Sequence, residues 1–258
     1  MKYIIGLFIA LVGFYAASEH LGQKMHEYWD FVAFFVVIFG TVAVLFISQP
    51  ATSMKNLFIR FVQKFIFGSP GMKKTAEKCW EVGNKREPIQ DPKTIEDRLL
   101  NDGLELISLG FDRNKTKEIL AHRYFLYENQ MQLLASWFKR TAKYPPAFGL
   151  SGTVLGLIHL MRGISTGIDS KETGLRMAVA LVATFYGLVI SNLVLNPLGE
   201  WLTEETKKDQ MKSEMCIETI DLILEGANII ELQERINSYL DPSDRLSSLG
   251  LEGTAEAV

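Results

Sequence analysis

The sequence of 258 residues predicts an all-α fold, a polytopic membrane protein with four transmembrane helices and a helical cytoplasmic domain. Four segments contain no Asp, Glu, Lys or Arg: residues 4–17, 31–47, 147–161 and 177–195. Charged residues lie between and after these segments, where apolar residues recur at helical spacing. We expect spans one and two within residues 1–48, a helical cytoplasmic loop domain over 49–143, spans three and four within 144–198, and cytoplasmic C-terminal helices with a loose tail over 199–258.

The uncharged segments differ in how well they fit a bilayer. A spanning helix needs about 17–25 mostly apolar residues, and residues 31–47, 144–161 and 177–195 meet that length. Residues 4–17 are short, so they would span only a thinned bilayer or one crossed upright. The alternative for this first segment is a signal peptide cleaved near Ala16-Ala17-Ser18, although its single Lys2 is a weak basic region.

Lys and Arg set the expected orientation, because cytoplasmic loops of membrane proteins are enriched in them. Residues 49–143 hold 17 of the 27 basic residues. We therefore expect this loop and both termini to be cytoplasmic in a bacterial inner membrane. The loop carries net charge +6 and residues 199–258 carry −9. The two pieces would either pack on each other or on neighbouring subunits, or present solvated faces.

Several cytoplasmic helices are expected. Residues 54–68 are amphipathic and basic, which favours either an interfacial helix on anionic lipid or a helix packed on its neighbours. Residues 95–109, 114–132 and 200–225 follow at helical spacing. Gly226 is a plausible end for the third of these helices. Asn228 with Glu231 has capping-box spacing for a last helix reaching Leu240.

The sequence lacks the signatures of an enzyme, a cofactor site or a metal site. Its mild acidity excludes a strongly basic nucleic-acid binder. His159 is the single ionisable group inside the expected spans, near an outer end where a solvated structural role is the more common one. An ion path through lipid usually needs a carboxylate. If this protein handles ions, we expect a partner chain to supply that group.

Spans three and four each carry a face of small residues, which lets helices approach closely. One face comprises Gly149, Gly152, Thr153 and Gly156, and the other Ala180, Thr184, Gly187 and Ser191. The faces either pack within one chain or line a partner helix, with the hydroxyls of Thr153 and Thr184 offered to a passing ion. Pro146 and Pro197 bracket the spans and are expected to permit a kink or hinge.

At these residues the sequence resembles the flagellar stator A subunits, MotA and PomA, of the MotA/TolQ/ExbB family. Residues 144–157, YPPAFGLSGTVLGL, are similar to the family pattern PAFGxxGTVxGL. Residues 177–198, MAVALVATFYGLVISNLVLNPL, resemble MAVALxTTxYGxxxxNxxxxPL, with Ala183 in place of one threonine. The tail is similar to IxEGxNPxxLxxxLxxxL, with Ile229 in place of its proline.

The resemblance implies a pentamer of A subunits around two B-type subunits, each B subunit supplying an ion-binding Asp. It implies transport of H⁺ or Na⁺ without a cofactor, Thr153 and Thr184 near the ion route, and functional prolines at Pro146 and Pro197. Torque would act on the rotor protein FliG. The family's loop motif is not recognisable, and Lys85, Arg86 and Glu87 occupy its region. They are either a rotor contact or a solvated turn.

Two alternatives remain. An ExbB/TolQ-type energiser of an outer-membrane process usually has three spans, whereas four are expected here. A passive membrane scaffold would use the small faces for self-assembly alone. Dependence of swimming on an imposed ion gradient separates a driver from a scaffold.

Overall fold

The computed structural model describes residues 2–20, 22, 29–48, 68–167 and 169–246, together with six positions between 55 and 65. Within these residues every regular element is a helix. The chain divides into two compact units, residues 1–59 with 133–202 and residues 60–132 with 203–258, which we call unit 1 and unit 2. The helix expected over residues 54–68 and the tail beyond residue 246 lie largely outside the described residues.

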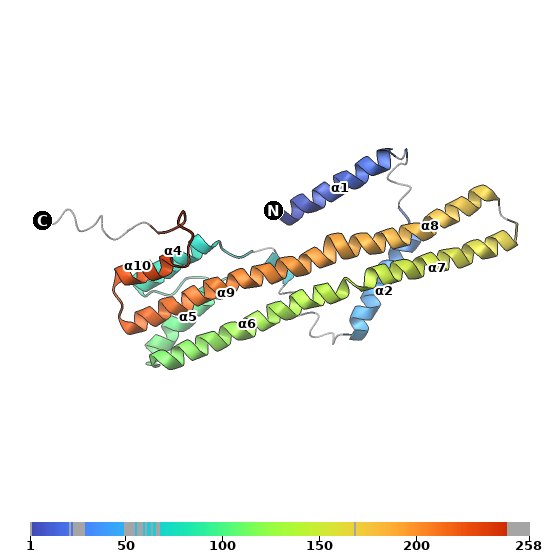
Figure 1. Ribbon diagram of the computed structural model, residues 1–258. Coiled ribbons are helices and arrows are strands. Elements are labelled where there is room, and N and C mark those ends of the chain that lie inside the picture. The colour runs from blue at the N-terminus through green and yellow to red at the C-terminus, as the bar shows by residue number, and fades with distance from the viewer. Residues whose placement is uncertain are drawn as a thin grey trace. The chain divides into compact units, whose positions relative to one another are not determined.

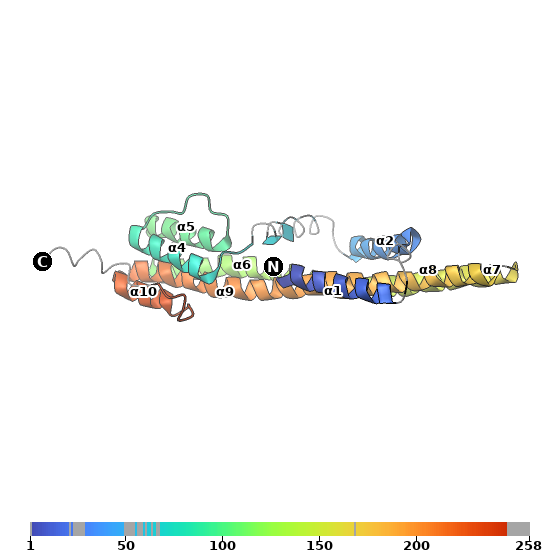
Figure 2. The same cartoon turned by 90° about the horizontal axis from the view of Figure 1, so that it is seen from above.

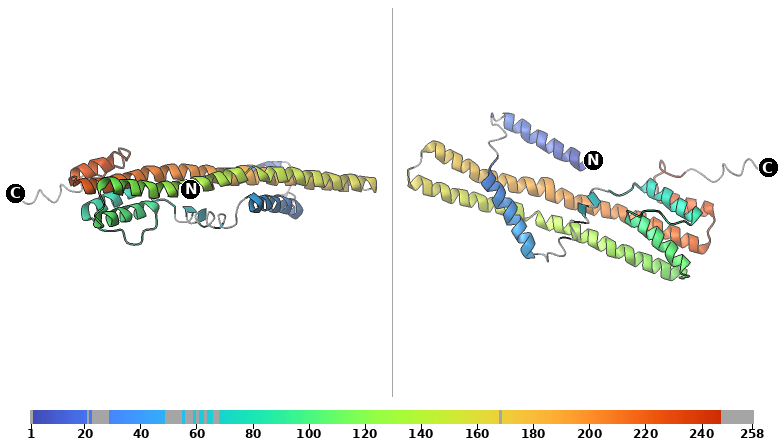
Figure 3. Two further views of the ribbon diagram at one scale, coloured as in Figure 1. Left: turned by 90° about the horizontal axis from the view of Figure 1, so that it is seen from below. Right: turned by 180° about the vertical axis from the view of Figure 1, so that it is seen from behind.

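Unit 1 contains four helices that correspond to the uncharged segments (Figure 1). They are α1 (Lys2–His20), α2 (Phe31–Ser48), α7 (Tyr144–Ser165) and α8 (Ser170–Val189). A π-helical segment, η2 (Ile190–Leu195), continues α8 into α9 (Asn196–Glu225). Helices α7 and α8 run side by side along their length, and α2 crosses both of them on one face (Figures 2 and 3). The ring of Phe14 on α1 meets Phe185 on α8 edge to face at 5.3 Å.

Large apolar side chains are exposed on these helices. Among them are Phe8, Phe39, Leu150 and Leu181, with exposed fractions of 57–66%. By length and composition, two helical stretches suffice to cross a membrane, one within Arg113–Ser165 and one within Lys171–Glu225. The apolar parts of α1 and α2 are shorter. Soluble monomers seldom expose apolar side chains on this scale, and such exposure is typical of helices that contact lipid or another protein.

Unit 2 is a helical cluster with its own apolar core. Its helices are α4 (Met72–Lys85), α5 (Ile95–Ser108), α10 (Ile229–Asn237) and most of α6 (Arg113–Thr141) and α9. Helices α4 and α10 lie against each other. The core is formed by fully buried side chains such as Leu99, Leu100, Leu120, Met215 and Ile220.

Two buried thiols join α4 to α9 in this core. Cys79 and Cys216 are both fully buried, with their sulfur atoms 3.6 Å apart and no disulfide between them. Burial, followed by the neighbouring Cys79, raises the pKa of the Cys216 thiol well above its ordinary value. Both cysteines are unbonded and fully buried, and they pack as small apolar core side chains.

Helix ends in unit 2 follow the expected local rules. Thr94 and Asp97 form a reciprocal capping box at the start of α5. Asn228 accepts a hydrogen bond from the Glu231 N–H at 2.8 Å, as its spacing predicts, and α10 ends at Asn237 rather than Leu240. Gly226 follows α9 with φ of +76°. These ends place the core-facing sides of α5, α9 and α10 against one another.

The oppositely charged pieces of the chain do pack together within unit 2. Arg113 on α6 holds Asp221 on α9 through two hydrogen bonds of 2.6 and 2.9 Å. Arg113 also pairs with Glu225 at 2.8 Å. Lys117 lies 3.5 Å from Asp221. The oppositely charged pieces therefore pack on each other at these residues, with Asp221 buried and Arg113, Lys117 and Glu225 about half exposed.

Candidate functional site

The small residues of α7 and α8 meet face to face. An added Cβ atom at Gly149 would lie 2.8 Å from the Ala183 carbonyl oxygen, and one at Gly156 would lie 2.5 Å from the Ala180 Cβ. At Gly152 the Ala183 Cβ would be 2.7 Å away. Real Cβ contacts do not come this close, so only glycine fits. The geometry favours packing within one chain for this face and explains why Ala183 is small.

Thr153 and Thr184 lie at the centre of the α7–α8 contact. Their hydroxyl oxygens are 2.5 Å apart, a hydrogen-bond distance. The Thr153 hydroxyl also lies 2.9 Å from the Ala180 carbonyl and 3.2 Å from the Gly149 carbonyl. Both side chains are half-buried. The result is a cluster of neutral oxygens, the hard ligand type that suits a small cation, between two apolar helices.

Pro146 acts at a helix boundary rather than inside a span. It is the third residue of α7, where a backbone N–H has no partner in any helix, so α7 loses no hydrogen bond to it. Because proline has no N–H, the Ala142 carbonyl lacks the donor that residue 146 would have supplied in a continuous helix. The buried hydroxyl of Ser191 donates to that carbonyl at 2.5 Å instead.

Removing the Ser191 hydroxyl tests whether its hydrogen bond to the Ala142 carbonyl replaces the one that Pro146 cannot make. We expect Ser191→Ala to destabilise the chain by about 1–3 kcal/mol, because the buried Ala142 carbonyl would lose its partner. Thermal unfolding in detergent measures the change. The control is Ser136→Ala, which removes an exposed hydroxyl that donates to the Leu133 carbonyl on the same helix. Equal effects of the two variants would contradict the assigned role of Ser191.

Pro197 follows a local change of helix type. It is the second residue of α9, directly after the π-helical segment η2. The Asn196 N–H donates to the Ser191 carbonyl, five residues earlier. A π turn inserts an extra residue into the helical repeat and is frequent at functional sites. The segment just before Pro197 is thus the irregular stretch of a helical run from Ser170 to Glu225.

Two more contacts position this hairpin. A Cβ at Gly187 would lie 2.4 Å from the Pro145 carbonyl oxygen and 3.0 Å from the Pro146 Cα, so backbone meets backbone here. The Tyr186 hydroxyl accepts from the Asp30 N–H at 3.0 Å, and the Asp30 carboxylate caps α2 by accepting from Ala33 at 2.6 Å. Sequence patterns did not indicate the Asp30–Tyr186 contact, because 156 residues separate its partners.

Lys85, Arg86 and Glu87 lie at the end of α4, a helix that the sequence analysis did not predict. Lys85 pairs with Glu81 one turn earlier at 2.7 Å, and both side chains are more than half exposed. Arg86 has φ of 57° and its N–H donates to the Val82 carbonyl, which closes the helix. Lys85 is thus the last residue of α4, and Arg86 and Glu87 follow it with exposed side chains.

A buried ionic network forms a second polar site, in unit 2. The Asp209 carboxylate is fully buried and accepts from Lys64, from Ser69 at 2.7 Å, from Tyr127 at 3.1 Å and from Lys212 at 3.2 Å. Lys212 also lies 3.4 Å from buried Glu96. Burial would raise the pKa of Asp209, but Lys64, Ser69 and Lys212 outweigh it, so the pKa lies below its ordinary value. Burial, together with Asp209 and Glu96, raises the pKa of Tyr127.

The sequence pattern of the MotA/TolQ/ExbB proton channel family matches residues 91–215 of this chain. This stretch includes all of α5 to α8 and the first two-thirds of α9. It therefore includes the face of small residues, both threonines and both prolines. The matched description is that of a channel, not of an enzyme.

Relatives of similar length resemble almost the whole chain. Motility protein A of Borreliella burgdorferi is 27% identical over 238 residues, covering 87% of this chain and 89% of its own. The uncharacterised protein YtxD of Bacillus subtilis is 25% identical over 240 residues, covering 91% and 86%.

The fold is also that of a chain in a solved MotAB structure. A chain in the structure of C. jejuni MotAB superposes with a TM-score of 0.81 at 17% identity, covering 95% of this chain and 98% of that one. The family pattern, the relatives named Motility protein A and the shared fold agree. The chain is thus similar to members of the MotA/TolQ/ExbB proton channel family over residues 91–215.

Proposed function

We propose that this chain is the A subunit of a flagellar stator ion channel. The observation that carries the proposal is the close-packed α7–α8 hairpin, which holds the Thr153–Thr184 hydroxyl pair within a segment free of acidic and basic side chains. A neutral oxygen cluster can pass a cation along but cannot balance its charge. The likeness to Motility protein A and to a MotAB structure supports a B-type partner that brings the balancing carboxylate.

The proposed topology has four spans, α1, α2, α7 and α8, in the bacterial inner membrane. Unit 2 and both termini lie in the cytoplasm under this proposal, because the basic residues gather in residues 49–143. Exposed phenylalanines and leucines on all four helices support contact with lipid or with neighbouring subunits. Assembly as a pentamer around a B-subunit dimer is part of the proposal.

The mechanism follows from the groups present. H⁺ or Na⁺ moving through a potential of 100 mV releases about 2.3 kcal/mol per charge. In the proposed motor the ion binds the partner's carboxylate, passes Thr153 and Thr184, and turns the ring of A subunits. Pro146 and Pro197 would act as hinges, since each adjoins a break in regular helix. Unit 2 would push on FliG, with Lys85, Arg86 and Glu87 as the rotor-facing candidates.

The test of this proposal removes one hydroxyl at nearly constant volume. We expect Thr184→Val to abolish swimming, because the oxygen pair with Thr153 is lost, and Thr184→Ser to retain it. A bulky residue at position 184 is unsuitable, since Gly149 lies against the Thr184 backbone. Swimming is scored in a strain whose single stator is this chain with its partner, and membrane extracts confirm equal amounts of assembled complex.

The same strain separates a driver from a passive scaffold. Swimming speed should rise with an imposed membrane potential or sodium gradient if ion flow through this complex drives the motor. Normal swimming of Thr184→Val, or speed that ignores both gradients, would contradict the proposed function. Rescue of an outer-membrane transport defect instead of motility would identify an ExbB/TolQ-type energiser.

A further inference from the structure

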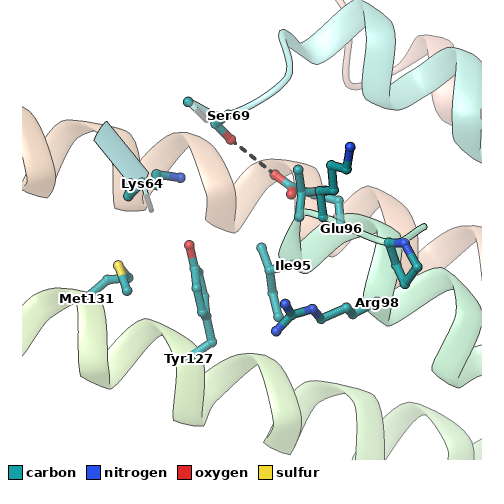
Figure 4. A pocket seen from close by; sticks show the side chains of 11 residues that line it. Lys64, Ser69, Ile95, Glu96, Arg98, Tyr127 and Met131 are labelled. Carbon is teal, nitrogen blue, oxygen red and sulfur yellow. Dashed lines mark hydrogen bonds between the residues drawn. The ribbon is translucent and has the colours of Figure 1, made fainter. Parts of the chain in front are cut away.

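A cavity of about 330 Å³ opens beside the buried ionic network of unit 2 (Figure 4). Its polar lining includes Lys64, Lys93, Glu96 and Arg98, and its apolar walls include Ile95 and Met131. This size is at the lower end of the range for small-molecule sites, about 300–1,000 Å³. All of the lining residues belong to unit 2 and none to α7 or α8, so an inference about the cavity neither needs nor weakens the proposed function.

The charges buried behind the cavity cancel one another. Lys64 and Lys212 face Asp209 and Glu96, two positive groups against two negative ones. Glu96, the acidic residue of the lining, is 1% exposed, and its carboxylate lies 3.4 Å from the Ser69 hydroxyl (Figure 4) and 3.4 Å from the Lys212 ammonium. Its charge is therefore already compensated on its buried side. The buried ionic network therefore contributes no net charge to the lining of the cavity.

Arg98 and Lys93 make the lining positive. Within the part of the chain that the structure describes, the Arg98 guanidinium has no ion pair, and it extends toward Tyr127 and Ile95 (Figure 4). Lys93 pairs with Asp91 at 3.0 Å, but both side chains are mostly exposed, and exposed pairs attract weakly. Lys64 is 9% exposed and has three ammonium donors, of which Asp209 uses one. Cationic donors therefore reach the cavity from different segments.

We propose that this cavity binds an organic phosphate, a phosphomonoester or phosphodiester carrying a small organic group. The planar fork of Arg98 matches two phosphate oxygens, and Lys64, whose charge Asp209 balances, adds N–H donors from the buried side. Bare phosphate would leave the Ile95 and Met131 walls uncovered, whereas a glycerol-sized group would cover them. The phosphate can come from a soluble metabolite or from a lipid headgroup, because Lys64 belongs to the basic segment that follows α2.

The test uses the full chain in detergent, with sn-glycerol 3-phosphate as the soluble probe and calorimetry as the readout. Arg98→Gln should weaken its binding at least tenfold, the equivalent of about 1.4 kcal/mol for one charged contact. Arg123→Gln is the matched control, since it removes the same charge from an arginine that pairs with Asp102 at 2.7 Å outside the cavity. Succinate tests whether a carboxylate substitutes for phosphate.

A second arm distinguishes the source of the phosphate. The chain is reconstituted in phosphatidylcholine bilayers with and without phosphatidylglycerol, and lipid retained after extraction is counted by native mass spectrometry. Loss of retained phosphatidylglycerol in Arg98→Gln alone identifies a lipid headgroup. Loss of soluble probe binding alone identifies a metabolite. The proposal is overturned if Arg98→Gln and Arg123→Gln behave alike in both arms, or if succinate binds as tightly as the phosphate. Arg98 is exposed, so both variants should fold, and thermal unfolding checks this.

Discussion

Gly187→Ala is expected to stop swimming and to destabilise the α7–α8 hairpin by about 1–3 kcal/mol or more. The added methyl would lie 2.4 Å from the Pro145 carbonyl oxygen and 2.9 Å from its carbon. Both are backbone atoms at the start of α7, so no side chain can rotate away. The helices would have to separate, and the Thr153–Thr184 pair and the Ser191–Ala142 hydrogen bond would separate with them.

The control for this variant lies on the same helix. Nothing approaches within 4 Å of an added Cβ at Gly174, so Gly174→Ala should keep motility and stabilise α8 by about 0.5–1 kcal/mol. Swimming assays and thermal unfolding in detergent measure both variants. If Gly187→Ala swims normally and unfolds like the parent chain, close packing at this point is not what the hairpin requires.

Asp209→Ala should be the most destabilising change in unit 2, by about 3–5 kcal/mol. The substitution leaves the ammonium groups of Lys64 and Lys212 buried with one carboxylate partner fewer, and an uncompensated buried charge is costly. It also removes the acceptor of Ser69 and Tyr127. Glu81→Ala, which breaks the exposed pair with Lys85, should change the unfolding free energy by no more than about 0.5 kcal/mol.

Because of the Asp209 carboxylate, the unfolding free energy of the chain is expected to fall in acid. The pKa of Asp209 is lower in the folded chain than in the unfolded one, where it is near 3.9. Its contribution is therefore fully present above that value and is lost as the pH falls through the folded pKa. Below about pH 4 the unfolding free energy of the parent chain should fall more steeply than that of Asp209→Ala. If the unfolding free energies of the parent chain and of Asp209→Ala change with pH in parallel, the network does not hold a charged Asp209.

Local sequence rules predicted much of the helical framework. Apolar spacing places a helix over residues 95–109, and the structure ends α5 at Ser108. Asn228 and Gly226 mark helix ends that the structure has. These features depend on neighbours within a few residues, where capping and periodicity decide the conformation. By contrast, α4 was missed, because its buried face is built from small residues such as Ala76 and Cys79 that give little apolar signal.

Long-range polar contacts could not be predicted from the sequence. Asp209 and Lys212 stand three residues apart on one helix, the usual pattern of a solvated face, yet both are buried. Their partners Lys64 and Ser69 lie about 140 residues earlier in the chain. The role of Ser191 was missed for a similar reason. A small polar residue on a helix face indicates packing, and only the position of Ala142 shows that its hydroxyl replaces a hydrogen bond that Pro146 cannot make.

The buried thiols of Cys79 and Cys216 can report local unfolding of unit 2. Both sulfurs are fully buried in the core, and burial raises the pKa of the Cys216 thiol, so an alkylating reagent reaches neither cysteine while α4 and α9 stay together. Labelling of either thiol then counts the molecules in which unit 2 has opened, in the way that amide exchange counts local unfolding. Because both cysteines belong to the sequence, local unfolding of unit 2 can be followed without an introduced probe, and it can be compared with and without a bound partner.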